Sequence, residues 1–285
     1  GSTNGWIPIE DDTVTDAPYT VTNPYGIFGY GKDASTRVST TNLVSNIGVF
    51  SSDVTGVGTA RSKPSACEYG SDKGIFGYGY TTTNVSMSNL VSNTGVVATD
   101  VTGVGTARNG GAAATYGGTK GIFGFGSDGS NYVGITNLVS NAGVVATDVA
   151  AVGTARGEGL GACEYSANKD KAIFGFGYDD SGDTAVTNLV SNTGVVASDV
   201  TGVGAVRDQL AACDYGDDKG IFAFGAGDSG ITAVSNLVSN TGVVASDVTG
   251  VGTARRQPGA TQYGTDKGIF CYGEDASART AVSNL

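Results

Sequence analysis

The sequence repeats itself about every 48 residues, and this repeat constrains the possible folds more than any other feature. The string Ile-Phe-Gly-Tyr/Phe-Gly, or a close variant, begins at Ile27, Ile75, Ile122, Ile173, Ile221 and Ile269. The string Asn-Leu-Val-Ser-Asn begins at Asn42, Asn89, Asn137, Asn188 and Asn236, and again at Asn284. A third string, Asp-Val-Thr-Gly-Val-Gly-Thr-Ala-Arg, occurs with variants at residues 53–61, 100–108, 148–156, 199–207 and 247–255. Six copies of one structural unit are therefore predicted.

Each unit has the composition of short β-strands joined by tight turns. Val, Thr, Ile, Tyr and Phe favour strands, while the intervening Gly and Asn favour turns. In the unit that follows Arg61, we expect strands at residues 66–69, 74–80, 85–92 and 96–101. Four short antiparallel strands in about 48 residues predict one blade of a β-propeller.

We predict an all-β fold in which residues 1–285 form a single six-bladed β-propeller of four-stranded antiparallel blades. The sequence stops at Leu285, inside the third expected strand of the sixth unit. Residues 1–15 are therefore expected to supply the strand that completes the last blade. Closing the ring in this way would leave no free sheet edge between the first and last blades.

The unit resembles the kelch-type β-propeller repeat. Arg61 precedes a small-residue strand ending in Tyr69, and the next strand ends in two glycines, Gly77 and Gly79. Here the two glycines are separated by one residue, and the tryptophan that kelch repeats usually carry late in the unit is absent. The wording Asn-Leu-Val-Ser-Asn-Thr-Gly-Val-Val also resembles repeats in predicted phage structural and tail-fibre proteins. That resemblance implies a virion or receptor-binding role.

Composition argues against several classes of function. The chain has no histidine, which removes the Ser-His-Asp and Cys-His arrangements and the His-ligated zinc sites. A net charge of -11 repels a phosphate backbone, so we expect no nucleic-acid partner. No apolar run approaches the length of a membrane span, so we expect no membrane insertion. Near-identical units also offer no single asymmetric cluster, so we expect no catalytic residues, no cofactor and no enzyme.

The recurring aromatic residues and glycines are interpreted as core. Phe76 and Tyr78 lie two residues apart and are expected on one face of the strand. Gly77 and Gly79 would lie on the other face, where they allow close approach of the next blade. The alternative is an aromatic ligand cage repeated around the ring.

The Asp and the Arg of the third string are expected to form a hydrogen-bond or ion-pair ring between blades. A repeated carboxylate-binding site is the alternative.

The cysteines and the acidic loops are assigned no metal site. Cys67, Cys163 and Cys213 occupy one position in different units, so we expect buried free thiols rather than disulfides. Unpaired cysteines mildly favour synthesis in a reducing compartment. The loop 179–183 gathers three carboxylates, but it does not match the twelve-residue calcium loop. We interpret such loops as solvated turns.

The units differ most in the loop after the second strand and in the segment after each Arg. In an up-and-down blade both connections emerge on one side of the ring, so the variable loops should share a face. We predict that this face binds a partner, since recognition usually lies on loops held by a rigid scaffold. Neutral drift at tolerant loop tips is the alternative. The predicted binding residues are Tyr80, Asp128, Tyr132, Tyr178, Asp179, Asp180 and Asp228.

The predicted function is a non-catalytic structural or interaction scaffold with a protein or glycan partner. The phage resemblance would make it a virion or tail-fibre binding module. The second prediction is a multivalent carbohydrate-binding propeller, in which repeated shallow sites gain avidity. Trp6 is the one tryptophan, but tyrosines in the variable loops could stack on sugars. Scattered substitutions and uneven spacing favour natural duplication over an engineered repeat.

Overall fold

The computed structural model describes residues 24–285, and within that range the chain forms strands, turns and loops but no helix. Six antiparallel sheets of the described residues define six units. Unit 1 pairs β1 (Gly26–Lys32) with β2 (Arg37–Val44). Unit 2 holds β3 (Ser65–Tyr69), β4 (Lys73–Gly77) and β5 (Ser88–Val91), and unit 3 holds β6 (Ala112–Tyr116), β7 (Lys120–Gly124) and β8 (Thr136–Val139).

The other three units repeat this three-stranded pattern. Unit 4 holds β9 (Gly161–Tyr165), β10 (Lys171–Gly175) and β13 (Thr187–Val190). Unit 5 holds β14 (Ala211–Tyr215), β15 (Lys219–Ala223) and β18 (Ser235–Val238). Unit 6 holds β19 (Gly259–Tyr263), β20 (Lys267–Cys271) and β21 (Ser283–Asn284). Two small hairpins lie in loops, β11 (Tyr178–Asp179) with β12 (Gly182–Asp183) and β16 (Ala226–Gly227) with β17 (Gly230–Ile231).

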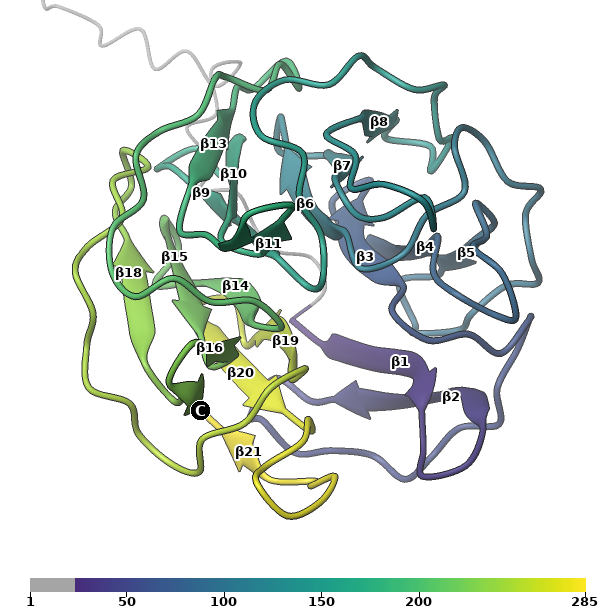
Figure 1. The fold of residues 1–285 in the computed structure, drawn as a ribbon. Coiled ribbons are helices and arrows are strands. Elements are labelled where there is room, and N and C mark those ends of the chain that lie inside the picture. Colours follow the sequence, from purple (N-terminus) through teal and green to yellow (C-terminus); the bar gives the residue numbers. More distant parts are fainter. Residues whose placement is uncertain (1–23) are drawn as a thin grey trace, which may run out of the picture.

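The six units follow one another in sequence order around one axis (Figure 1). The first strands β3, β6, β9, β14 and β19 contact one another in that order, and β19 also contacts β1. Backbone hydrogen bonds link the hairpin turns of neighbouring units, from Gly70 to Thr119 and from Gly216 to Asp266, at 2.8 and 2.7 Å. The matching bond from Gly264 to Pro24, at 2.8 Å, joins unit 6 to unit 1. The closing strand expected over residues 1–15 lies outside the described residues.

The strands are shorter than the sequence pattern predicts. The second strand of unit 2 ends at Gly77, because Tyr78 has a left-handed backbone with φ 61°. Such a φ is uncommon for an aromatic residue. It recurs at the equivalent residues Tyr30, Phe125, Phe176, Phe224 and Tyr272. The third strand covers only Ser88–Val91, and the fourth segment makes isolated bridges from Val97 and Val101 rather than a continuous strand.

The left-handed residue overturns one expectation about the aromatic side chains. Phe76 packs against Tyr30 of unit 1, whereas Tyr78 packs against Phe123 of unit 3. The two side chains therefore face opposite neighbours rather than sharing one face. Both are buried, with 4% and 3% of their surface exposed, so their interpretation as core is confirmed.

In units 1 to 4 a glycine precedes the left-handed aromatic residue, and a neighbouring unit approaches it closely. A Cβ added to Gly124 would lie 2.8 Å from Cζ of Phe174 in the next unit, and one added to Gly77 would lie 2.6 Å from Cζ of Phe123. Atoms this close would overlap, so the phenylalanine ring occupies the space that a side chain would need. The expected close approach of the next unit over glycine is confirmed at Gly77. It is wrong for Gly79, where an added Cβ would meet Ser62 and Pro64 of the same unit, because the left-handed Tyr78 reverses the alternation.

Each Arg of the third string is buried between two units. The guanidinium of Arg156 stacks 4.2 Å above the ring of Phe125 in the preceding unit. Its Nε donates a hydrogen bond of 2.9 Å to the carbonyl of Phe176 in its own unit. Burial lowers the pKa of Arg156 to about 10. Cation–π contact and charge-assisted hydrogen bonds together hold this cation in the core.

Four of the five Asp residues of the third string accept hydrogen bonds from the preceding copy of the string: Asp100, Asp148, Asp199 and Asp247. Asp53 accepts one from Asn42 of its own unit. The carboxylate of Asp148 accepts hydrogen bonds from the backbone N–H of Thr106 at 3.0 Å and from its hydroxyl at 2.7 Å, one period earlier in the chain. It also accepts 2.9 Å from Nδ2 of Asn137. Hydrogen bonds between units are thus present at four of the Asp positions, and the described residues show no ion pair between these Asp and Arg side chains.

Candidate binding face and axial cavity

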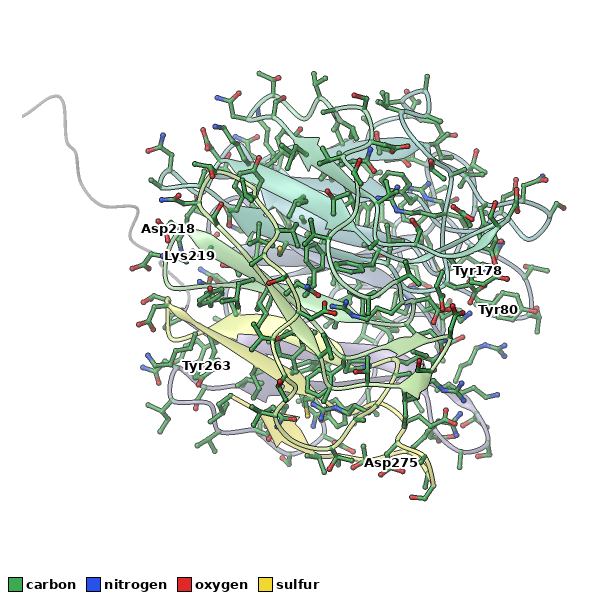
Figure 2. All side chains as sticks on the ribbon, turned by 60° about the vertical axis from the view of Figure 1, so that its left-hand side comes forward. Tyr80, Tyr178, Asp218, Lys219, Tyr263 and Asp275 are labelled. Carbon is green, nitrogen blue, oxygen red and sulfur yellow. The ribbon has the colours of Figure 1, made fainter. Side chains whose placement is uncertain are left out.

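The two variable segments of each unit pair with each other on one side of the molecule. Isolated bridges join the residue after each Arg to the loop after the second strand: Ser62 with Tyr80, Asn109 with Ser127, Gly157 with Tyr178, Asp208 with Ala226 and Arg256 with Glu274. We call this side the loop face. Figure 2 shows Tyr80 and Tyr178 on it, and Asp218 and Lys219, which lie in and after a first hairpin turn, on the opposite side. The prediction that the variable loops share a face is therefore confirmed.

A series of backbone hydrogen bonds, which we call the collar, links units 3 to 6 on the loop face. The N–H of Gly159 donates to the carbonyl of Gly110, that of Gln209 to Glu158, and that of Gln257 to Gln209, at 3.0, 3.0 and 2.7 Å. Left-handed residues make this path possible, with φ near 50° at Lys63, Glu158, Gln209 and Gln257. An ion pair of 2.8 Å from Lys63 to Glu158 spans units 2 and 4. The collar gives the variable loops a rigid base.

Two of the predicted binding residues form an aromatic pair above this collar. The rings of Tyr132 and Tyr178, from units 3 and 4, lie 5.9 Å apart with their planes tilted. Tyr178 leaves 37% of its surface exposed. Burial raises the pKa of Tyr132, and the charges of Glu158, Asp180 and Asp208 raise it further. A pair of amphipathic rings beside carboxylates can stack on a ligand and accept hydrogen bonds from it.

Carboxylates accompany the tyrosine pair on the loop face. Burial raises the pKa of Asp183 to about 6, with further contributions from the charges of Asp208 and Asp228. Asp208 is 8% exposed and accepts hydrogen bonds from Nε2 of Gln209 at 3.1 Å. Mutual repulsion and desolvation disfavour the charged forms of these carboxyls, which a hydrogen-bond donor or a cation from a partner would relieve.

The remaining predicted residues do not join this cluster. Tyr80 lies in unit 2, where the guanidinium of Arg37 sits 4.7 Å from its ring centre. Asp128 accepts hydrogen bonds from the backbone N–H groups of Ser130 and Asn131, both at 2.8 Å, and so stabilises its own turn. Asp179 does the same for Ser181 at 2.7 Å. Turn formation accounts for both aspartates.

Sequence reasoning missed Glu158, Asp183 and Asp208 as members of the cluster. Glu158 and Asp208 stand in the variable segments after Arg156 and Arg207, so their position was a usable signal. Asp183 was visible within an acidic loop. Residues 24–285 contain no group of three His, Cys, Asp or Glu placed to hold a metal ion.

The cysteines of the first strands are free thiols that fill spaces between units. Sγ of Cys67 lies against Gly121 of the next unit, Cys163 against Gly220 and Cys213 against Gly268. Burial raises the pKa of Cys67 to about 12, which keeps its sulfur protonated. The expectation of free thiols is confirmed. At Gly121, Gly220 and Gly268 the absence of a side chain leaves room for the sulfur of the neighbouring unit.

A cavity of about 680 Å³ is lined, in the described part of the chain, by residues of the first strands β3, β6, β9, β14 and β19 and by residues of units 1 and 2 around β1, β2, β4 and β5. Its lining includes Ser71 and Asp72 of a first hairpin turn and Asn93 of the turn after β5. It includes none of the collar residues. The cavity therefore reaches the side opposite the loop face, and none of the predicted binding residues lines it.

No protein-family model and no curated protein matches this sequence. Among solved structures, that of YjhT is similar, with a TM-score of 0.65 and 11% sequence identity over 92% of this chain and 91% of YjhT. At this identity the likeness concerns the fold alone, which is all-β and built from many small antiparallel sheets. Within residues 24–285 no helix has the length and apolar character needed to span a membrane.

Proposed function

We propose that the six units form a six-bladed β-propeller with four antiparallel strands in each blade. The order of the sheets around one axis supports this, as does the contact of β19 with β1. The bridges from Val97 and Val101 place a fourth segment beside the third strand, β5. The similarity to YjhT spans nearly the whole of both chains. A crystal structure of residues 1–285 tests the proposal, which a different number of blades would contradict.

We propose that this propeller is a non-catalytic interaction scaffold whose loop face binds a protein partner. One observation carries the proposal: the half-buried Tyr132 and the exposed Tyr178 form a pair beside carboxylates on loops that vary, while the core beneath repeats from unit to unit. Aromatic side chains dominate the binding energy of protein interfaces, and a rigid base lowers the entropy cost of binding. Because the repeat sequence resembles repeats in predicted phage structural and tail-fibre proteins, we propose that the protein belongs to a virion or tail fibre.

Panning of a displayed random-peptide library against the full chain tests the loop face. Enriched peptides are then titrated against wild type, a Tyr132→Ser/Tyr178→Ser double variant and a control Asp218→Asn variant on the opposite side. We expect the double variant to weaken binding by at least about tenfold and the control to leave it unchanged, as for loss of an aromatic anchor. Peptides that bind the double variant as well as wild type would overturn the proposal, as would a failure to enrich any.

A carbohydrate-binding function is the second candidate, favoured by the same tyrosine pair. Aromatic faces stack on the C–H surface of sugars, and neighbouring carboxylates accept hydrogen bonds from their hydroxyl groups. A glycan array separates the two functions. Signal that Tyr178→Ser abolishes would favour the lectin, and uniform absence of signal would count against it.

A further inference from the structure

The variable loops of the loop face share one geometry at their bases. Each loop after a second strand starts and ends at two residues that pair with each other, and this pairing recurs in all six units. We call the first the opening residue and the second the closing residue. The opening residues of units 2, 4 and 5 are Tyr80, Tyr178 and Ala226. The closing residues of units 1, 3 and 4 are Arg37, Tyr132 and Asp183.

The closing residue of one unit contacts the opening residue of the next. Between units 1 and 2, the guanidinium of Arg37 lies 4.7 Å from the ring centre of Tyr80. Between units 3 and 4, the same two places hold Tyr132 and Tyr178, with their rings 5.9 Å apart. A hydrogen bond of 3.0 Å joins these places between units 2 and 3. The loop face therefore already contains one arginine held on a tyrosine, and Tyr178 occupies the place of that tyrosine.

At the junction of units 4 and 5, the same two places hold Asp183 and Ala226. Asp183 pairs with Tyr178 across the base of its own loop. Asp208 pairs with Ala226 and is 8% exposed. The charges of Asp208 and Asp228 act on Asp183 and add to the effect of burial on its pKa. Among the described residues, no lysine or arginine forms an ion pair with any of these three carboxylates.

Charge is distributed unequally around the loop face. Every charged side chain in the variable segments of units 3, 4 and 5 is a carboxylate. The lysines and arginines of these segments belong to units 6, 1 and 2: Lys32, Arg37, Lys63, Arg256 and Arg279. Two of them already have partners, since Lys63 pairs with Glu158 at 2.8 Å and Arg256 pairs with Glu274 at 3.0 Å. Units 3 to 5 therefore complement a positively charged surface.

We propose that the protein partner of the loop face presents an arginine to the junction of units 4 and 5, where its guanidinium pairs with Asp183 and Asp208 beside the ring of Tyr178. This inference rests on the proposed function and narrows the partner to one with an exposed basic segment. Arginine fits better than lysine, because a planar guanidinium stacks on an aromatic ring and also donates to two carboxylate oxygens. A second copy of the chain is disfavoured, because a net charge of -11 on each copy opposes their approach.

The peptides enriched by panning on the full chain are the probes for this inference. We expect arginine to be over-represented among them relative to the unselected library. In fluorescence anisotropy titrations, the most enriched peptide should bind at least about tenfold more tightly than an analogue with citrulline in place of each arginine, because citrulline keeps the shape and lacks the charge. An analogue with lysine in place of arginine should bind with intermediate affinity.

Two variants test where the arginine binds. Asp183→Asn/Asp208→Asn should weaken binding of the arginine peptide by at least about tenfold, whereas Asp217→Asn/Asp218→Asn removes as many charges on the opposite side and should leave it unchanged. Tyr132→Arg should also weaken binding, because it reproduces within the chain the contact of Arg37 with Tyr80 and covers Tyr178. Thermal melts of each variant show whether it remains folded.

The outcomes separate this inference from the proposed function. No enrichment of arginine, equal affinity for the citrulline analogue, or equal weakening by the two double aspartate variants would each overturn the inference, while the tyrosine variants would still decide the proposed function. Sedimentation velocity of the wild type without peptide tests the other occupant. A dimer that Asp183→Asn/Asp208→Asn abolishes would assign the face to a second copy and would likewise overturn the inference.

Discussion

Gly124→Ala is expected to destabilise the fold by steric overlap with the neighbouring unit. The added Cβ would lie 2.8 Å from Cζ of Phe174 and 3.2 Å from Cγ2 of Thr136. The backbone at Gly124 is not left-handed, so alanine meets no strain in φ. In a strand, alanine is otherwise favoured over glycine by about 0.5–1 kcal/mol. The sign of the effect therefore depends on whether the ring of Phe174 can move.

The distances between aromatic rings in the other units show how far the Phe174 ring would have to move. Where glycine stands at this position, the aromatic rings of neighbouring units are 5.1 or 5.2 Å apart, as for Phe125 and Phe174. Across Ala223 the rings are 5.5 Å apart, and across Cys271 they are 5.6 Å apart. A methyl group thus requires a shift of several tenths of an ångström. Overpacking costs about 1–3 kcal/mol, so we expect Gly124→Ala to lower the free energy of unfolding by about 1–2 kcal/mol.

A double-mutant cycle in urea denaturation, followed by circular dichroism, measures this overlap. Phe174→Leu removes the ring atoms that the new methyl group meets, so the double variant should be more stable than the sum of the single effects by about 1 kcal/mol or more. Gly74→Ala is the matched control, because its Cβ would meet nothing closer than 3.5 Å. Equal stability of the Gly124→Ala and Gly74→Ala variants, or a coupling near zero, would refute the reasoning.

Three further predictions concern charged side chains. Arg156→Met should lower the free energy of unfolding by about 2–4 kcal/mol in denaturant titration, because it removes the stacking on Phe125 and leaves buried carbonyls without a donor. Burial acts to raise the pKa of Asp148, but hydrogen bonds led by that from Thr106 outweigh it and lower the pKa. The stabilising contribution of Asp148 is therefore present above pH 3.8 and lost as pH falls through its folded pKa, and Asp148→Asn should flatten the acid limb of a melting-temperature profile. Glu68, whose pKa is raised from 4.5 to about 7, should make stability fall as pH rises between those values, and Glu68→Gln should remove that slope from the same profile.

Much of the fold follows from the repeat because its causes are local. Strand composition, turn residues and the period together predict six similar antiparallel units. The buried Phe76 and the glycine beside it follow from the same pattern, as do free cysteines at one position of several units. Each of these features depends on residues close together in the chain.

The backbone at Tyr78 did not follow from the pattern. Ile-Phe-Gly-Tyr-Gly alternates like a strand, yet the strand stops at Gly77 and Tyr78 turns toward the next unit. The guanidinium of Arg108 then stacks 3.9 Å from the Tyr78 ring. Phe123 and Arg108 both belong to the next unit and lie far from Tyr78 in the chain, so packing between units selects the left-handed conformation.

The candidate sites, too, are in part visible in the sequence and in part decided by packing between units. Variation among the repeats identifies the loop face, and Tyr132 and Tyr178 are visible as aromatic residues in variable loops. Their contact is decided by the approach of units 3 and 4. Glu68, Glu164 and Asp214 are likewise visible as the residue before a tyrosine in three units, about 50 or 100 positions apart.

The sequence by itself determined how many units form, what each contains and which loops vary, because those depend on short-range pattern. Only the tertiary structure decided that one position of every first strand surrounds a common axis. Arrangement of the units around that axis brings three distant carboxylates into one cavity, where burial changes their chemistry.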